Sequence, residues 1–205
     1  MLVRHGSSAR QPATDGADLV DDHNDPPLDD SGLRQAEAVG ARIARRRADE
    51  LFVTPLRRTR QTAAPLAGRL GREPVVVPEL REVHLGDWEG QLNARVADGG
   101  ELSRAIFAAE RWDVIPNAES MDAFSDRVRR GMAHLVDTVG PDGVAVAFVH
   151  GGVIAEACRQ TTGSQAFAFL YAENASITRL VRMASGRWAL ISFNDTAHLQ
   201  GHDGM

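Results

Sequence analysis

Short apolar runs alternate with amphipathic stretches along this chain of 205 residues, and the alternation predicts where its elements lie. The clearest run, Val144–Val149, is apolar at every position, which is typical of a strand covered on both faces. Further strands are predicted over Leu2–Val3, Glu50–Thr54, Pro74–Val77 and, as a closing hairpin, Ala175–Arg182 and Arg187–Phe193. A buried, mostly parallel sheet is therefore expected.

Helical periodicity fills most of the intervals between these runs. After Ser31, the apolar residues Leu33, Ala36, Val39 and Ile43 form one stripe at helical spacing. Helices are predicted from Ser31 to the Arg45–Arg47 run, over Pro55–Leu70, Leu92–Arg111 and Glu119–Val139, and from His150 to about Thr161. Alternating strands and helices predict an α/β fold, a three-layer sandwich with a mostly parallel central sheet, as a single domain over residues 1–205.

The composition is that of a globular protein, with 43% hydrophobic and 25% charged residues. A formal net charge of -5 argues against a broad nucleic-acid surface, which needs clustered basic residues. No apolar stretch approaches the roughly 20 residues of a membrane span, and the first residues lack the basic region and apolar segment typical of a signal peptide. Cys158, the only cysteine, lies in an apolar run and is expected to be a buried, inert thiol. We therefore expect a cytoplasmic protein without nucleic-acid or membrane partners.

The segment Ser7–Asp30 is polar and long enough to be a loop rather than a regular element. Its side chains with metal-binding chemistry are His23, Asp15, Asp18, Asp21, Asp22 and Asp25. We interpret them as a polar rim or flap beside a site rather than as metal ligands, so no metal is predicted.

Two histidines each follow a predicted buried strand directly. The predicted strand Leu2–Val3 runs straight into Arg4 and His5, and His150 comes directly after Val149. Ligands of open parallel sheets bind beyond the carboxyl ends of the strands, so both imidazoles are expected to face one crevice. The glycine after each histidine, Gly6 or Gly151, lets the backbone turn and approach a ligand closely. For either histidine alone, a core side chain satisfied by hydrogen bonds is an equal alternative.

Two further stretches carry charged side chains at element junctions. Thr54–Ala63 places three arginines at the start of a predicted helix, where the helix dipole and guanidinium groups favour an anion. A solvated helix face is the alternative for such a run. Leu80–Gly90 is loop-like and contains Glu82, Asp87, Glu89 and Trp88. Read alone, it indicates only a turn.

In this order, the four stretches resemble the histidine phosphatase superfamily, also called the phosphoglycerate mutase-like family, in its phosphatase branch. The resemblance covers nearly the whole chain and implies a phosphatase that uses a phosphohistidine and needs no cofactor. His5 then corresponds to the nucleophile and Glu82 to the acid that serves the leaving group. The implied phosphate-binding residues are Arg4, His5, Ser8, Arg58, His150 and Gly151. Such a site would take a small phosphorylated substrate.

Two rival functions stay open. A phosphoglycerate mutase uses the same phosphohistidine but must exclude water, and members of this family that do so carry an insert after the acid. Here only residues 91–118 separate Gly90 from Glu119, which favours a phosphatase. The other alternative is a non-catalytic protein that binds a phosphorylated ligand on the same fold.

The identity of the substrate is less well marked. Glu82–Gly90 resembles the corresponding stretch of glucosyl-phosphoglycerate phosphatases, which favours sugar or glycerate phosphates. The candidates for the pocket mouth, each with a helix-face or core interpretation beside it, are Arg10, Arg95, Arg104, Arg111 and Trp112. A homodimer is compatible with the family fold.

Overall fold

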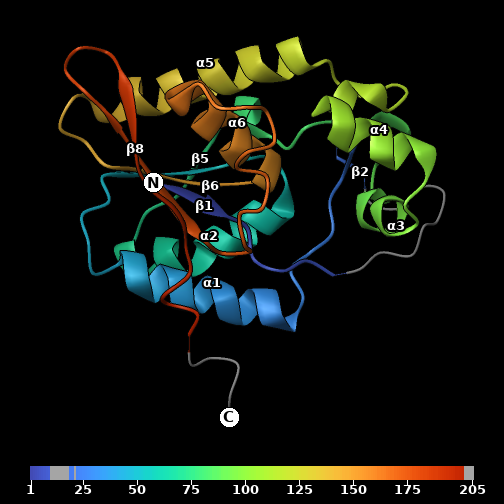
Figure 1. Cartoon of the computed structure of the whole chain (residues 1–205). Coiled ribbons are helices and arrows are strands. Elements are labelled where there is room, and N and C mark those ends of the chain that lie inside the picture. The colour runs from blue at the N-terminus through green and yellow to red at the C-terminus, as the bar shows by residue number, and fades with distance from the viewer. Residues whose placement is uncertain (10–18, 21, 201–205) are drawn as a thin grey trace.

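The computed structural model describes residues 1–9, 19–20 and 22–200, and it has a mixed α/β fold (Figure 1). The strands of the central sheet are β1 (Leu2–Arg4), β4 (Glu50–Val53), β5 (Val75–Val76), β6 (Ala145–Val149), β7 (Ile177–Arg182) and β8 (Trp188–Asp195). They lie in the order β5-β4-β6-β1-β7-β8: the first four are parallel to one another, β7 is antiparallel to β1, and β8 is antiparallel to β7. A small hairpin of β2 (Leu19–Val20) and β3 (His23–Asn24) stands apart from this sheet. The predicted fold class is confirmed.

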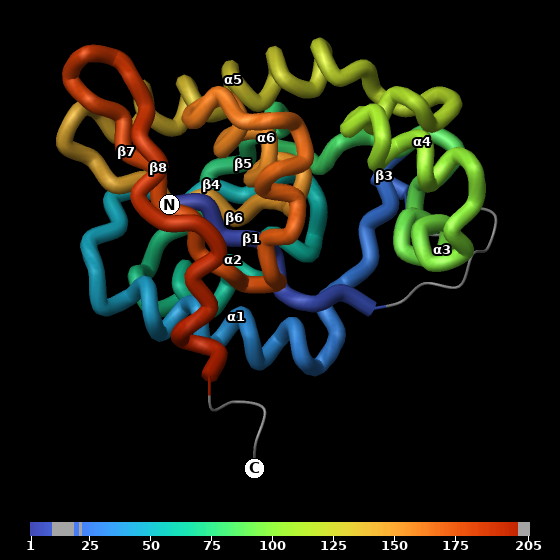
Figure 2. Tube along the Cα trace, in the orientation of Figure 1, coloured from blue at the N-terminus to red at the C-terminus, as the bar shows by residue number. Residues whose placement is uncertain are grey.

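Helices cover both faces of the sheet. Those in the described part of the chain are α1 (Asp30–Ile43), α2 (Arg57–Leu70), α3 (Leu92–Ala97), α4 (Glu101–Ala109), α5 (Met121–Val139) and α6 (Gly151–Thr162). Short 3-10 turns are η1 (Pro78–Leu80), η2 (Gly86–Trp88) and η3 (Trp112–Val114). In Figures 1 and 2, α1 and α2 lie on one side of the sheet, α5 and α6 on the other, and α3 and α4 beyond one end of it.

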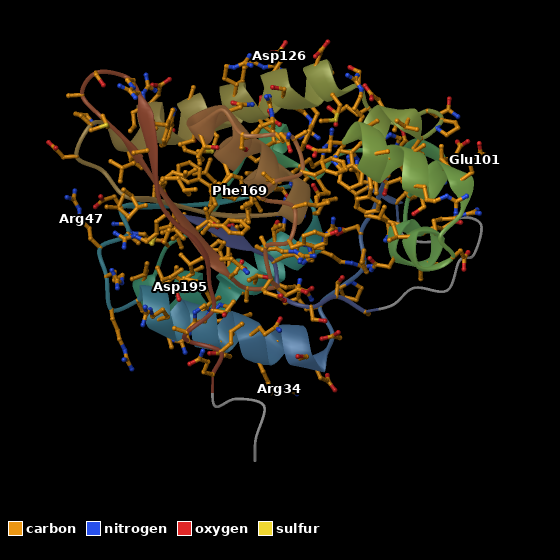
Figure 3. The ribbon with its side chains drawn as sticks, viewed as in Figure 1. Arg34, Arg47, Glu101, Asp126, Phe169 and Asp195 are labelled. Atoms are coloured by element: carbon orange, nitrogen blue, oxygen red, sulfur yellow. The ribbon has the colours of Figure 1, made fainter. Side chains whose placement is uncertain are left out.

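The alternation of side chains along β6 explains why its whole sequence is apolar. Val146 and Phe148 face the cluster that contains residues of α1 and α2, whereas Ala147 and Val149 face the cluster that contains residues of α5 and α6. All four are at most 1% exposed, so neither face of β6 tolerates a polar side chain. Exposed charged side chains lie outside these layers, as Figure 3 shows for Arg34, Arg47, Glu101 and Asp126.

The start of α2 is stabilised from a distant part of the chain. Its N-cap residue, Leu56, makes no side-chain capping bond. The carboxylate of Asp25 takes that role, because its two oxygens accept from the backbone N–H of Arg57 at 2.9 and 3.1 Å. Asp25 is 4% exposed and His23 is 6% exposed, so the interpretation of these two residues as a polar rim is wrong. Exposed Asp22 fits that interpretation, whereas Asp15, Asp18, Asp21 and Arg10 lie outside the described residues.

Of two other expectations from the sequence, the structure corrects one and confirms the other. The segment predicted as one helix over Leu92–Arg111 forms two, because Gly99 adopts a positive φ of 63° between α3 and α4. Cys158 is buried as predicted, and burial raises the pKa of its thiol to about 12. Among the described residues, no helix is long and apolar enough to cross a membrane.

Candidate active site

The ends of β1 and β6 bring the two predicted histidines together. The strands are parallel neighbours in the register Arg4 to Val149, so the residues that follow them leave the sheet side by side. The backbone N–H of His5 donates to the carbonyl of Val149 at 2.9 Å, and the rings of His5 and His150 lie 5.3 Å apart between centroids. The two histidines are 7% and 0% exposed. The predicted convergence of the imidazoles is therefore present.

A hydrogen bond fixes which nitrogen of His5 is available. Nδ1 lies 2.8 Å from the carbonyl oxygen of Gly6, and since a carbonyl only accepts, Nδ1 carries the proton. Nε2 of the neutral ring then keeps a lone pair. Burial and, after it, the positive charges of Arg58 and Arg4 lower the pKa of His5 well below 6.5, which favours this neutral form.

The two arginines predicted to bind phosphate, Arg4 and Arg58, are held by backbone carbonyls beside the histidines. Nη1 of Arg4 donates to the carbonyl of Ala172 at 2.5 Å. Nη1 of Arg58 donates to the carbonyl of Asn24 at 2.7 Å and lies 3.7 Å from the carboxylate of Asp25. Burial lowers the pKa of both guanidinium groups, but arginine stays protonated in proteins. The site therefore contains two fixed positive charges.

Glu82 lies at the start of α6, against both arginines. Its charge opposes the effect of burial on the pKa of Arg4 and of Arg58. Its Oε2 accepts from the backbone N–H of Gly152 at 3.2 Å, and its Oε1 accepts from the N–H of Val83 at 3.0 Å. A Cβ at Gly152 would lie 2.5 Å from Oε1, so this close approach requires glycine.

Two buried nitrogens of this cluster have no hydrogen-bond partner within the described part of the chain. They are Nε of Arg4 and Nδ1 of His150. Nε2 of His150 is paired, at 3.0 Å from the hydroxyl of Thr54. Buried polar atoms are rarely left unpaired unless a ligand or water completes them. Beside two arginines, such nitrogens suit the oxygens of an anion.

The remaining predicted phosphate-binding residues are less closely defined. A Cβ at Gly151 would lie 3.5 Å from Nε of Arg4, so the backbone of this glycine borders the site. Ser8 lies in a bridge with Leu28, and its contact with a phosphate stays a prediction.

The candidates for the pocket mouth have local partners instead. Arg95 donates to Gln91, Arg104 to the carbonyl of Gly99, and Arg111 to Asp113. Trp112 is 5% exposed and belongs to the core. The helix-face and core interpretations are therefore the better ones. Within residues 1–9, 19–20 and 22–200, no three His, Cys, Asp or Glu side chains are grouped to hold a metal ion.

Several residues that support the site were not identified from the sequence. Glu89 joins two segments, because its Oε2 accepts from the N–H of Asn24 at 3.0 Å and its Oε1 from the N–H of Leu85 at 2.8 Å. Asn24 in turn accepts from Arg58 through its carbonyl. The one available signal was the absence of a capping residue before α2, which implies an acceptor such as Asp25 elsewhere in the chain.

Proteins that are already known resemble this chain in both sequence and fold. The profile of the histidine phosphatase superfamily (branch 1) matches residues 1–196. A probable phosphoglycerate mutase of Serratia proteamaculans is 31% identical over 97% of this chain and 93% of its own length. The structure of a mycobacterial glucosyl-3-phosphoglycerate phosphatase with inorganic phosphate is 28% identical, with a TM-score of 0.78 over 96% of this chain and 97% of that one. A phosphoglycerate mutase of Bacillus anthracis shares the fold, with a TM-score of 0.79 at 19% identity over 99% of this chain and 95% of that one.

Proposed function

We propose that this chain, which belongs to the histidine phosphatase superfamily, hydrolyses a small phosphomonoester through a phosphohistidine formed on His5. The family match confirms the resemblance indicated by the sequence motifs. Together with the phosphatases among the similar structures, it makes the chain an enzyme that acts on phosphate monoesters. Membership of the family does not decide between hydrolysis and transfer of the phosphoryl group, nor does it assign roles to individual residues. These two points are our proposal.

In the proposed first step, the lone pair on Nε2 of His5 attacks phosphorus, and the bond from phosphorus to the substrate oxygen breaks. Negative charge on the transferred group is then stabilised by Arg4, Arg58 and His150. These donors are already in place, so they stabilise the transition state without reorganisation. Glu82 gives the leaving oxygen the proton that it takes up in the complex with substrate.

In the second step, water attacks the phosphohistidine and inorganic phosphate leaves. Glu82, now ionised, takes a proton from that water, and Nε2 of His5 regains its lone pair. One difficult displacement thus becomes two easier ones. Arginine and histidine side chains supply the positive field, so the proposed reaction uses no metal ion.

One observation carries the proposal: the two unpaired buried nitrogens, on Arg4 and His150, border a neutral His5 whose Nε2 is free to attack. A scaffold protein could bind phosphate there, but it would gain nothing from a histidine kept neutral. A phosphoglycerate mutase is the second candidate, since a relative bears that name. Against it, only residues 91–118 separate Gly90 from Glu119, which leaves little chain for the cover that a mutase needs to exclude water.

The test is a substrate panel assayed with purified protein in the presence of a chelator. The panel contains p-nitrophenyl phosphate, glucosyl-3-phosphoglycerate, phosphoserine and 3-phosphoglycerate, the second and third taken from the names of similar phosphatases. We expect inorganic phosphate to be released, fastest from one of the sugar or glycerate phosphates. For 3-phosphoglycerate, phosphorus NMR separates hydrolysis from isomerisation. A positional isomer formed faster than phosphate would establish a mutase, and strict dependence on a divalent ion would refute the mechanism.

The cellular setting and assembly of the enzyme remain predictions. We expect it in the cytoplasm, without nucleic-acid or membrane partners, and we regard a homodimer as compatible with the fold. Light scattering of the purified protein tests the assembly directly.

A further inference from the structure

Behind the site lies a pair of buried threonines that the proposed reaction does not use. Thr54 follows β4, Thr59 lies in the first turn of α2, and both are 0% exposed. Their hydroxyl oxygens are 3.1 Å apart, and the hydroxyl of Thr54 lies 3.0 Å from Nε2 of His150. The pair therefore contacts the active site at one atom.

The hydrogens of these hydroxyl groups can be accounted for. The hydroxyl of Thr59 donates to the carbonyl of Leu56 at 2.8 Å and accepts from the N–H of Thr54 at 3.2 Å. The hydroxyl oxygen of Thr54 accepts from the N–H of Leu56 at 3.3 Å. Its own hydrogen then has two acceptors within reach, the oxygen of Thr59 and Nε2 of His150.

The choice between these acceptors decides what His150 presents to the substrate. If Thr54 donates to Nε2, the proton of a neutral His150 is on Nδ1, the buried nitrogen that has no partner in the described residues. If Thr54 accepts from Nε2, a lone pair on Nδ1 faces the place where the phosphoryl oxygens must lie. Only the first arrangement gives a neutral ring a donor for an anion.

The surroundings of His150 keep the ring neutral in the empty site. It is completely buried, and the charged or titratable groups that act on it are Arg58 of α2, His5 after β1, His23 of β3 and Arg127 of α5. Burial comes first and the four basic groups follow, and all of them disfavour the imidazolium ion. A neutral ring must therefore have the correct tautomer to bind an anion.

We propose that Thr54 is a positioning residue for catalysis: its hydroxyl donates to Nε2 of His150 and holds the ring in the tautomer whose Nδ1–H points at the transferring phosphoryl group. This inference rests on the proposed function, because it assigns His150 the phosphoryl oxygens as acceptors. Loss of the partner that orients a metal-bound histidine typically costs about 10- to 100-fold in activity, and we expect a loss on that scale for His150.

The first experiment reads the tautomer without turnover. Nitrogen-15 NMR of the histidine-labelled enzyme, with His150 assigned by its loss in a His150→Asn variant, distinguishes protonated Nδ1 from protonated Nε2. We expect protonated Nδ1 in the wild type and in Thr54→Ser, which keeps the hydroxyl. In Thr54→Val the proton should move at least partly to Nε2. Protonated Nε2 in the wild type would overturn the proposal.

The second experiment compares kinetics in two matched variants. Thr54→Val should lower kcat about 10- to 100-fold with a smaller change in KM, and Thr54→Ser should restore most of kcat. Thr59→Val removes an equally buried hydroxyl and leaves Nε2 of His150 as the acceptor for the hydroxyl of Thr54, so it should keep both the tautomer and kcat. A urea titration of each variant shows how much stability each hydroxyl contributes.

The pH profile adds a readout that a purely structural role would not change. In Thr54→Val the neutral rings of His150 that carry their proton on Nε2 have no donor at Nδ1, and protonation of the ring restores that donor, so the relative loss of kcat should shrink as the pH falls. An equal loss at every pH, or equal losses in Thr54→Val and Thr59→Val, would overturn the proposal. Should His5→Ala retain full turnover, the proposed function itself fails, and the NMR result still reports the tautomer independently.

Discussion

Two buried polar clusters in this protein differ in whether their polar groups find hydrogen-bond partners within the protein. At the junction of α5 and α6, Glu156 accepts from Nε and Nη2 of Arg159 at 2.7 and 2.8 Å and from the side-chain amide of Gln160 at 2.7 Å. That amide also donates to the carbonyl of Ser125 at 2.8 Å. In the active site, by contrast, the partners that would complete the cluster are not supplied by the described part of the chain.

The difference separates structural stabilisation from function. The Glu156 cluster satisfies its own charges, so its carboxylate contributes to holding two helices together. An unpaired buried polar atom costs about 1–3 kcal/mol, which the folded protein recovers only when something binds there. A buried cluster without internal partners is therefore better evidence for a ligand site than a fully paired one.

The largest expected effect is on turnover when the proposed nucleophile, His5, is removed. His5→Ala should lower kcat for p-nitrophenyl phosphate by at least about 10⁴-fold, the scale seen when a covalent nucleophile is lost. Glu156→Gln serves as the control from the other cluster and should keep kcat within about twofold. Comparable losses in the two variants would mean that the assignment of function to one cluster is wrong.

The next effect distinguishes acid catalysis from binding. Glu82→Gln should lower kcat for alkyl phosphates by about 100-fold or more, because the leaving alkoxide needs a proton. Aryl phosphates such as p-nitrophenyl phosphate leave without much help and should be affected far less in this first step.

The same variant should also accumulate the intermediate. Since Glu82 is the proposed base for water in the second step, Glu82→Gln given p-nitrophenyl phosphate should trap an acid-labile phosphohistidine on His5. Rapid quenching followed by mass spectrometry detects it, and the wild type serves as the control. Equal losses on alkyl and aryl substrates, with no trapped phosphoenzyme, would assign Glu82 a purely structural role.

The contributions of the two clusters to the free energy of unfolding should also be lost in different ranges of pH. Burial and neighbouring positive charges lower the pKa of His5 and of His150 below 6.5, so the unfolded chain binds more protons as the pH falls through that value. The free energy of unfolding should therefore be highest above pH 6.5 and should decrease as the pH falls below that value. Urea unfolding above and below this pH measures it. The double variant His5→Asn, His150→Asn should lose most of the slope, and an unchanged slope would exclude these histidines as its source.

The contribution of Glu156 to the free energy of unfolding should change only at lower pH. Burial alone would raise the pKa of this carboxyl, but the hydrogen bonds from Arg159 and Gln160 outweigh it and hold the pKa below 4.5. Its contribution is therefore present above pH 4.5 and is lost as the pH falls further.

The smallest effect concerns Glu156 at neutral pH. Glu156→Gln keeps the shape of the side chain but removes the charge that pairs with Arg159, so the free energy of unfolding should fall by about 1–2 kcal/mol. Urea unfolding at pH 7 measures this change, with kcat/KM as the second readout. A stable variant with impaired turnover would place Glu156 in the functional cluster after all.

The sequence predicted the site at the points where a strand ends in a reactive side chain. His5 and His150 could be placed together because parallel strands that are buried on both faces present their carboxyl ends at one edge. The roles of Arg4, Arg58 and Glu82, however, came from the family resemblance, since isolated arginines and carboxylates are compatible with any solvated surface.

The supports of the site could not be predicted in the same way. Asp25 and Asn24 act through contacts with α2 that depend on the path of the chain between β1 and α1. Nothing in the local sequence distinguishes Asp25 from the neighbouring exposed Asp22. The hydroxyl of Thr54 is likewise recognisable only when β4 is known to lie next to β6.

The position of β1 in the sheet has a consequence for biosynthesis. β1 lies between β6 and β7, although both of these strands follow it in the chain after α5. At a translation rate of about 5–20 residues per second, the ribosome needs roughly 10 to 35 seconds after making His5 to reach β7. The proposed nucleophile, His5, is therefore synthesised among the first residues but reaches its place between β6 and β7 among the last. A chain whose translation stops within α5 would carry His5 without its neighbouring strands, and complementation between two fragments cut at residues 140–143 would have to reunite the two histidines across the break.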